Sequence, residues 1–104
     1  MDDIVVYKNR TNVLSVSLGS DVSADTFTSE IREKVGVASP LIATWDVAFL
    51  TDGTDGELVL TLDDSELVAV TQKAGYMDIK RTSGGEPYEV FPPIKVKLVE
   101  VVTA

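Results

Sequence analysis

The sequence predicts an all-β fold, a two-layer β-sandwich with one short helix, formed by residues 1–104 as a single domain. Three observations predict it. Val, Ile and Thr are abundant, and their branched side chains fit a pleated sheet. Apolar and polar residues alternate over short runs separated by Gly, Pro, Asn and Asp, as in a sandwich or barrel. The chain of 104 residues is long enough for one modest core.

Four strands are expected in the first half of the chain. In the last three of them the inward side chains are expected at alternate positions, and in the third segment the core candidates are Phe27 and Ile31. The segments are Ile4 to Lys8; Leu14, Val16 and Leu18; Phe27, Ser29 and Ile31; and Leu41 to Phe49. We expect Trp45 to be the central residue of the core.

A hairpin and a helix are expected next. The Asp-Gly pairs in residues 51–56 favour a tight turn, because these residues accept the positive φ of a chain reversal. The return strand 57–62 places its leucines inward. Asp63 then resembles a helix N-cap, with Glu66 completing a capping box, and Leu62 and Leu67 flank it as a hydrophobic staple. The helix should be about two turns long.

The last part of the chain predicts three further strands. They are separated by a glycine turn at 83–85 and by Pro92-Pro93, which removes two consecutive backbone donors. The strands are expected at Tyr76 to Arg81, Tyr88 to Phe91, and Ile94 to Leu98.

Composition excludes several classes of function. Nine Lys and Arg residues against 17 Asp and Glu give a formal charge of −8, which disfavours nucleic acid and anionic membranes. No apolar run is long enough to cross a bilayer. Because the chain has no His and no Cys, it has no Ser-His triad, thiolate nucleophile or imidazole metal ligand. We expect no enzyme activity, catalytic residue, cofactor or metal.

The acidic clusters have structural explanations. Asp52, Asp55 and Glu57 do not match the spacing of an EF-hand, and a solvated turn is favoured over a calcium loop. Asp63 and its acidic neighbours suit a helix start better than an acid/base pair. Asp78 is expected to be half-buried and paired across strands with a Lys or Arg.

The terminal strands suggest a surface for a partner. Residues 99–102 add apolar side chains on both faces of the last strand, and an exposed apolar edge is a template for another chain. The alternative is that both terminal strands lie centrally in their sheets and are covered. The candidate partner interface comprises Val5, Tyr7, Phe91, Val99, Val101 and Val102.

Five segments together resemble small immunoglobulin-like domains of tailed bacteriophages, most closely the N-terminal domain family of the phage baseplate upper protein. They are Tyr7 to Leu14; Asp25 to Arg32; Gly56 to Leu62 with the acidic run to Glu66; Gly75 to Lys80; and Ile94 to Val102. Pro92-Pro93 stands where such domains often have a glycine turn.

The resemblance implies a two-layer immunoglobulin-like β-sandwich with one short helix and a non-enzymatic virion structural protein. Such a chain would be a multicopy tail, baseplate or fibre-adaptor module, or a head-decoration protein, assembled in the host cytoplasm and docked to other virion proteins as a homo-oligomer or symmetric assembly. The alternative is a host-surface carbohydrate-binding module. Its candidate aromatic residues are Tyr7, Tyr76, Tyr88 and Phe91.

Overall fold

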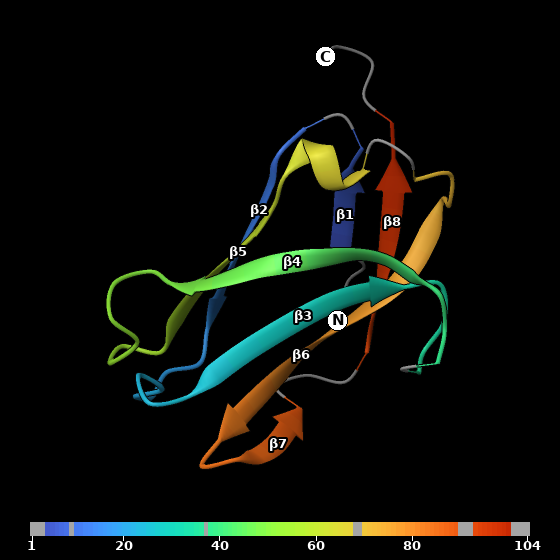
Figure 1. The fold of residues 1–104 in the computed structure, drawn as a ribbon. Coiled ribbons are helices and arrows are strands. Elements are labelled where there is room, and N and C mark those ends of the chain that lie inside the picture. Colours follow the sequence, from blue (N-terminus) through green and yellow to red (C-terminus); the bar gives the residue numbers. More distant parts are fainter. Residues whose placement is uncertain (1–3, 9, 37, 68–69, 90–92, 101–104) are drawn as a thin grey trace.

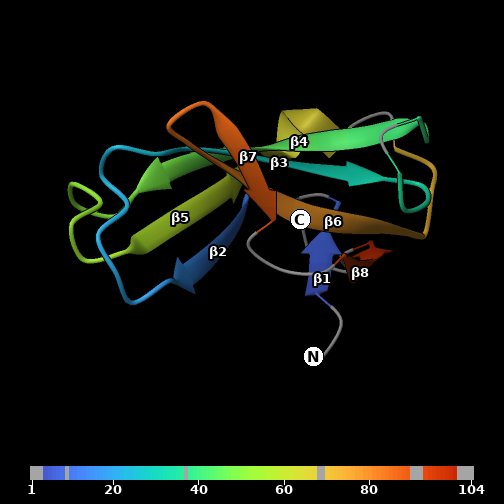
Figure 2. The same ribbon diagram turned by 90° about the horizontal axis from the view of Figure 1, so that it is seen from below.

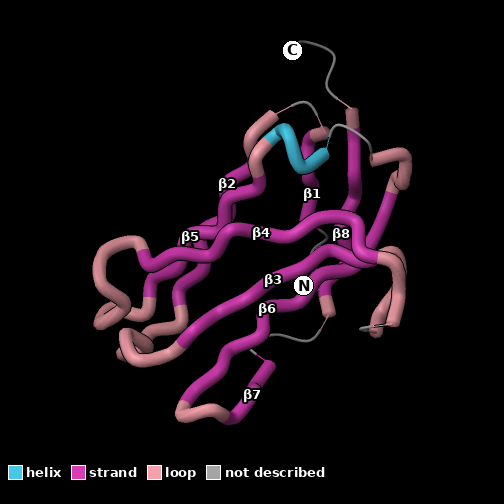
Figure 3. Tube along the Cα trace, in the orientation of Figure 1, coloured by secondary structure: helices cyan, strands magenta, loops and turns pink. Residues whose placement is uncertain are grey.

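The computed structural model describes residues 4–8, 10–36, 38–67, 70–89 and 93–100, and within them the fold is all-β, as predicted (Figure 1). One short 3-10 helix, η1, interrupts eight strands (Figure 3). In chain order the elements are β1 (Ile4–Tyr7), β2 (Asn12–Ser17), β3 (Thr26–Arg32), β4 (Leu41–Phe49), β5 (Glu57–Leu62), η1 (Asp64–Leu67), β6 (Ala74–Ser83), β7 (Glu86–Glu89) and β8 (Ile94–Val99).

The strands form one continuous path in the order β1-β8-β6-β3-β4-β5-β2, and β7 pairs with β6. All pairs are antiparallel except β1 with β8. β4 changes partner halfway along. Its first part pairs with β3 up to the register Ser29↔Trp45, and its second part pairs with β5 from Asp46↔Thr61. The strands therefore curl around a shared interior, as the view from below shows (Figure 2).

The curled sheet is almost closed. Its two end strands, β1 and β2, are consecutive in the chain, but no backbone ladder joins them in the described residues. Asn12, the first residue of β2, spans the gap with its side chain. Its Oδ1 accepts a hydrogen bond from the Tyr7 N–H at 2.9 Å, and its Nδ2 donates to the Tyr7 carbonyl at 2.9 Å. One amide side chain thus replaces a backbone bridge at this seam.

The core agrees with the alternation in the sequence. Trp45 is 4% exposed, and its Nε1 has no hydrogen-bond partner in the described residues. Phe27 and Phe49 are half-buried and meet edge to face, with ring centroids 6.2 Å apart. The three inward leucines of β5 are fully buried, as expected: Leu58, Leu60 and Leu62.

The expected two-turn helix is wrong, because η1 is a single 3-10 turn. The Asp63 carbonyl accepts the Glu66 N–H at 3.0 Å, which is an i to i+3 bond, and the Asp63 side chain accepts from Ser65 N–H at 3.0 Å. Asp63 therefore caps the turn as expected, but in a tighter geometry. Leu67 is buried, and η1 packs against β4.

The two terminal strands differ in environment. β8 lies between β1 and β6, so the alternative of a centrally placed last strand holds for β8. β1 pairs only with β8 among the described strands, so it is an end strand.

Candidate functional site

The site is built on one face of the β1-β8-β6-β3 part of the sheet. The register between the strands determines which side chains lie on this face. Tyr7 pairs with Val99, and Tyr76 pairs with both Lys95 and Arg32. The residues that alternate with them along each strand, such as Val6, Val96 and Met77, are buried on the other face. We call this surface the outer face. It comprises Val5 and Tyr7 of β1, Lys95, Lys97 and Val99 of β8, Tyr76, Asp78 and Lys80 of β6, and Thr28, Glu30 and Arg32 of β3.

The β1 end of the outer face contains three of the predicted interface residues. Val5 and Tyr7 are each 43% exposed, and Val99 is half-buried opposite Tyr7. The Arg10 guanidinium lies 6.0 Å from the centre of the Tyr7 ring. The structure thus brings Val5, Tyr7 and Val99 together. The other three predicted residues lie outside the described residues: Phe91, Val101 and Val102.

β1 also has an open side. The Lys8 N–H donates to the Val99 carbonyl at 2.9 Å, whereas the Tyr7 N–H points the other way, to Asn12. Because successive N–H groups of a strand point to opposite edges, Val5 directs its backbone groups to the same side as Tyr7. No described strand pairs with that side of β1. Backbone groups of this kind are available to an added strand.

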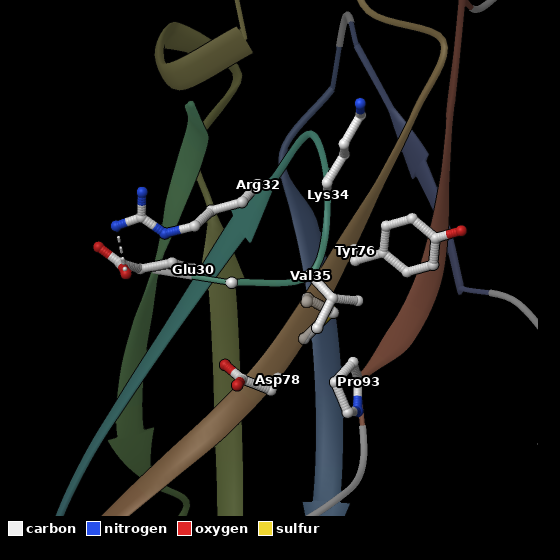
Figure 4. A pocket seen from close by; sticks show the side chains of 9 residues that line it. Glu30, Arg32, Lys34, Val35, Tyr76, Asp78 and Pro93 are labelled. Atoms are coloured by element: carbon white, nitrogen blue, oxygen red, sulfur yellow. Dashed lines mark hydrogen bonds and ion pairs between the residues drawn. The ribbon is translucent and has the colours of Figure 1, made fainter. Parts of the chain in front are cut away.

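A hollow of about 180 Å³ lies at the β3–β6 end of the outer face (Figure 4). The Arg32 guanidinium donates to Glu30 Oε1 at 3.0 Å and to the Ser39 carbonyl at 2.6 Å, so it is fixed at one rim. Tyr76 and Asp78 project from β6 on the other sides. The complete lining is Glu30, Arg32, Lys34, Val35, Gly36, Tyr76, Met77, Asp78 and Pro93.

The expected partner of Asp78 is wrong. Asp78 is half-buried, as expected, but its cross-strand neighbour on β3 is Glu30, a like charge, and no described cation pairs with its carboxylate. Like charges directly opposite each other are unfavourable, and Arg32 relieves this repulsion at Glu30 alone. Arg32 itself lies in a cross-strand row with Tyr76 and Lys95. The hollow therefore offers the Tyr76 ring and the cations Arg32 and Lys34 beside two carboxylates, and Lys95 lies next to Tyr76 outside the lining.

The opposite end of the molecule carries an acidic tip, which we define as the two loops 19–25 and 50–56. The loops are joined by the backbone, because Val22 N–H donates to the Gly53 carbonyl at 2.8 Å. The backbone and side chain of Ser23 donate to Asp21 and lower its pKa, and the side chain and backbone of Thr54 donate to Asp52 and lower its pKa. The carboxylates of Asp21 and Asp52 thus serve as turn caps, which for Asp52 agrees with the expected solvated turn.

The two acidic side chains at the start of η1, Asp63 and Asp64, share a hydrogen bond. Hydrogen bonds to Ser65 lower the pKa of Asp63, and the hydrogen bond that Asp64 shares with Asp63 raises the pKa of Asp64. Both side chains are exposed. In the described residues, no group of three or more acidic side chains is placed to hold a metal ion, and no helix is long and apolar enough to span a membrane.

Sequence reasoning missed two features. Asn12 lies between the first two expected strands and drew no attention there, whereas in the structure it begins β2 and bonds to both backbone groups of Tyr7. The hollow was missed because the pairing of Tyr76 with Arg32 and Lys95 depends on register between distant strands. A scan against family models and a search of curated proteins found no match to this chain.

Proposed function

We propose that the chain is a non-enzymatic structural protein of a bacteriophage virion, a multicopy tail, baseplate, fibre-adaptor or head-decoration module that docks to other virion proteins. The observation that carries the proposal is β1, an end strand with an open edge and with Val5 and Tyr7 exposed beside it. The resemblance to phage baseplate domains adds the class of particle.

The immunoglobulin-like sandwich is part of this proposal. The pairing of β4 with both β3 and β5 supports it, because the chain would then pass from one layer to the other along β4, over a shared core that contains Trp45 and Leu60. The near-closure of the path between β1 and β2 is the feature that such a sandwich would share with a barrel. In either description the outer face stays available for docking.

Docking at β1 would use backbone and side chains together. An extended partner segment would hydrogen-bond to the outward backbone groups of Val5, while Val5 and Tyr7 would lose their remaining contact with water. Burial of two large, partly exposed side chains contributes on the order of 1–3 kcal/mol, which is enough for specificity but not for tight binding by itself. Repetition in a symmetric particle would supply the rest.

The experiment is mass spectrometry and electron microscopy of intact particles, with phage that carry substitutions in this chain. We expect the chain in many copies per particle, and we expect Val5→Lys with Tyr7→Ser to reduce its incorporation strongly. Val13→Lys is the matched control, since Val13 is 65% exposed on β2, away from the outer face. Absence of the chain from purified particles, or equal incorporation of all variants, would remove the proposal.

A second function, carbohydrate binding at a host surface, is favoured by the hollow. Tyr76 could stack on a sugar ring while Glu30, Asp78 and Arg32 hydrogen-bond to its hydroxyl groups. A glycan array tests this. Binding that is lost in Asp78→Asn and retained in Val5→Lys would support it, and an array with no binder would exclude it.

A further inference from the structure

The charges of this acidic chain are segregated. The strands of the outer face carry four cations and two carboxylates, namely Arg32, Lys80, Lys95 and Lys97 against Glu30 and Asp78. Lys34 adds a fifth cation at the hollow. The acidic tip contains the exposed carboxylates of Asp21, Asp52 and Asp55. Its fourth carboxylate, Asp25, is already paired with Arg81 of β6 at 2.6 Å. In Figure 1 the tip loops lie to the left and β1 and β8 to the right. The three exposed carboxylates of the tip are therefore complementary in charge to the cations of the outer face.

The two loops of the acidic tip are held together by backbone hydrogen bonds and expose an apolar side chain. The bond from Val22 to Gly53 and a second bond from Leu18 N–H to the Gly56 carbonyl, at 2.9 Å, hold the two loops together. Leu50 begins the second loop and is 60% exposed. An apolar side chain that projects next to carboxylates fits a receiving surface with a hollow and cations around it.

The hollow on the outer face has these properties. Its volume of about 180 Å³ exceeds that of one leucine side chain, and Val35, 63% exposed, and Tyr76 supply apolar lining. Lys34 lines it and Lys95 lies beside Tyr76, and both are exposed with no ion-pair partner among the described residues. Lys34 and Lys95 could therefore form ion pairs with carboxylates of a partner without first losing an ion pair within the described residues.

We propose that the acidic tip of one copy docks on the outer face of a second copy, with Leu50 seated in the hollow beside Tyr76 and with the tip carboxylates facing Lys34 and Lys95. This inference rests on the proposed function and names a partner for it, a second copy of the chain. Because the two contacting surfaces differ, the contact is head-to-tail and repeats, so that it produces a ring or a filament rather than a closed two-fold dimer.

Asp78 supplies an internal check. Its carboxylate, which has no ion-pair partner among the described residues, lines the hollow and would repel the incoming tip. Replacing it by Asn removes the charge and keeps the shape. Head-to-tail docking therefore predicts that Asp78→Asn strengthens self-association, about threefold for one partly exposed charge.

The test is sedimentation equilibrium of the full chain at low and high salt. We expect the mean mass to rise with concentration. Neutralising the tip with Asp21→Asn, Asp52→Asn and Asp55→Asn keeps the turn acceptors and should weaken association about tenfold, as should Lys34→Gln with Lys95→Gln on the face. A mixture of the tip variant and the face variant retains one intact contact per pair. It should therefore form 1:1 complexes that do not grow.

Two controls separate docking from general charge effects. Asp63→Asn, Asp64→Asn and Glu66→Gln remove as many acidic charges at η1, and Lys34→Arg with Lys95→Arg keeps the face positive; both should associate like the original chain. Growth of the mixture beyond two copies, or weaker association of Asp78→Asn, would overturn head-to-tail docking. A chain that is monomeric at all concentrations and yet present in particles would overturn this inference and leave the proposed function standing.

Discussion

Removal of the Asn12 side chain tests whether one amide closes the seam between β1 and β2. Asn12→Ala deletes its bonds to both backbone groups of Tyr7, at 2.9 Å each, and its bond to the Arg10 carbonyl, at 3.0 Å. A net hydrogen bond contributes roughly 0.5–1.5 kcal/mol, and water can replace part of this at an accessible site. We therefore expect a loss of about 1–2 kcal/mol in the free energy of unfolding, and roughly 5–9 °C in Tm for a chain of this size.

Denaturant unfolding and amide hydrogen exchange measure this effect. Exchange should accelerate at the Tyr7 amide and along β1, while the amides of β5 keep their protection, because the seam is local to β1 and β2. Thr11→Ala is the matched control, since Thr11 is exposed and next to Asn12. If Asn12→Ala is as stable as Thr11→Ala and the Tyr7 amide exchanges at its original rate, the amide does not close the seam.

Three further predictions concern the core, a glycine and pH. Leu60→Ala, at a fully buried side chain, should cost about 2–5 kcal/mol in denaturant unfolding. Gly56→Ala should be strongly destabilising in thermal unfolding, because Gly56 has a φ of 75° and a Cβ there would collide with the backbone oxygen of Ser20. Because the pKa values of Asp21 and Asp52 are lowered in the folded protein, their ionised carboxylates stabilise the fold at pH values above the ordinary pKa of 3.8. This contribution is lost as pH falls through the lower folded-state pKa values, which a pH series of unfolding measures, and Asp21→Asn with Asp52→Asn should flatten it.

Each of these predictions has a contrary outcome. Val13→Ala is the surface control for Leu60→Ala, since Val13 is 65% exposed, and an equal loss at both positions would mean that β5 does not form the core. A fully stable Gly56→Ala would contradict the close approach of the two tip loops. An unchanged pH profile after both Asn substitutions would show that the turn hydrogen bonds do not depend on ionisation.

Local alternation was sufficient to predict the inward faces. A strand alternates with a period of two residues, so Leu58, Leu60 and Leu62 could face the core only together, and Trp45 followed from the same pattern. The short helix was harder to predict. Asp63 provides the expected cap, but the i to i+3 bond to Glu66 forms a 3-10 turn, a choice that capping residues do not determine.

The site depended on information that is not local. The hollow exists because β3, β6 and β8 lie side by side in one register, which places Arg32, Tyr76 and Lys95 in a row. The same register puts Asp78 against Glu30 instead of a cation. Of the predicted interface, Val5, Tyr7 and Val99 meet because β1 pairs in parallel with β8, a contact between the two ends of the chain that alternation alone does not specify.

The parallel pairing of β1 with β8 also sets the order in which the fold can be completed during synthesis. Residues 4–7 are synthesised before every other described strand, yet the only described strand that pairs with them spans residues 94–99. β1 therefore lacks this partner until residues 94–99 have been synthesised. Contacts between such distant segments form slowly, so the nascent chain is most exposed to misassociation in this interval, and chaperone binding should concentrate there.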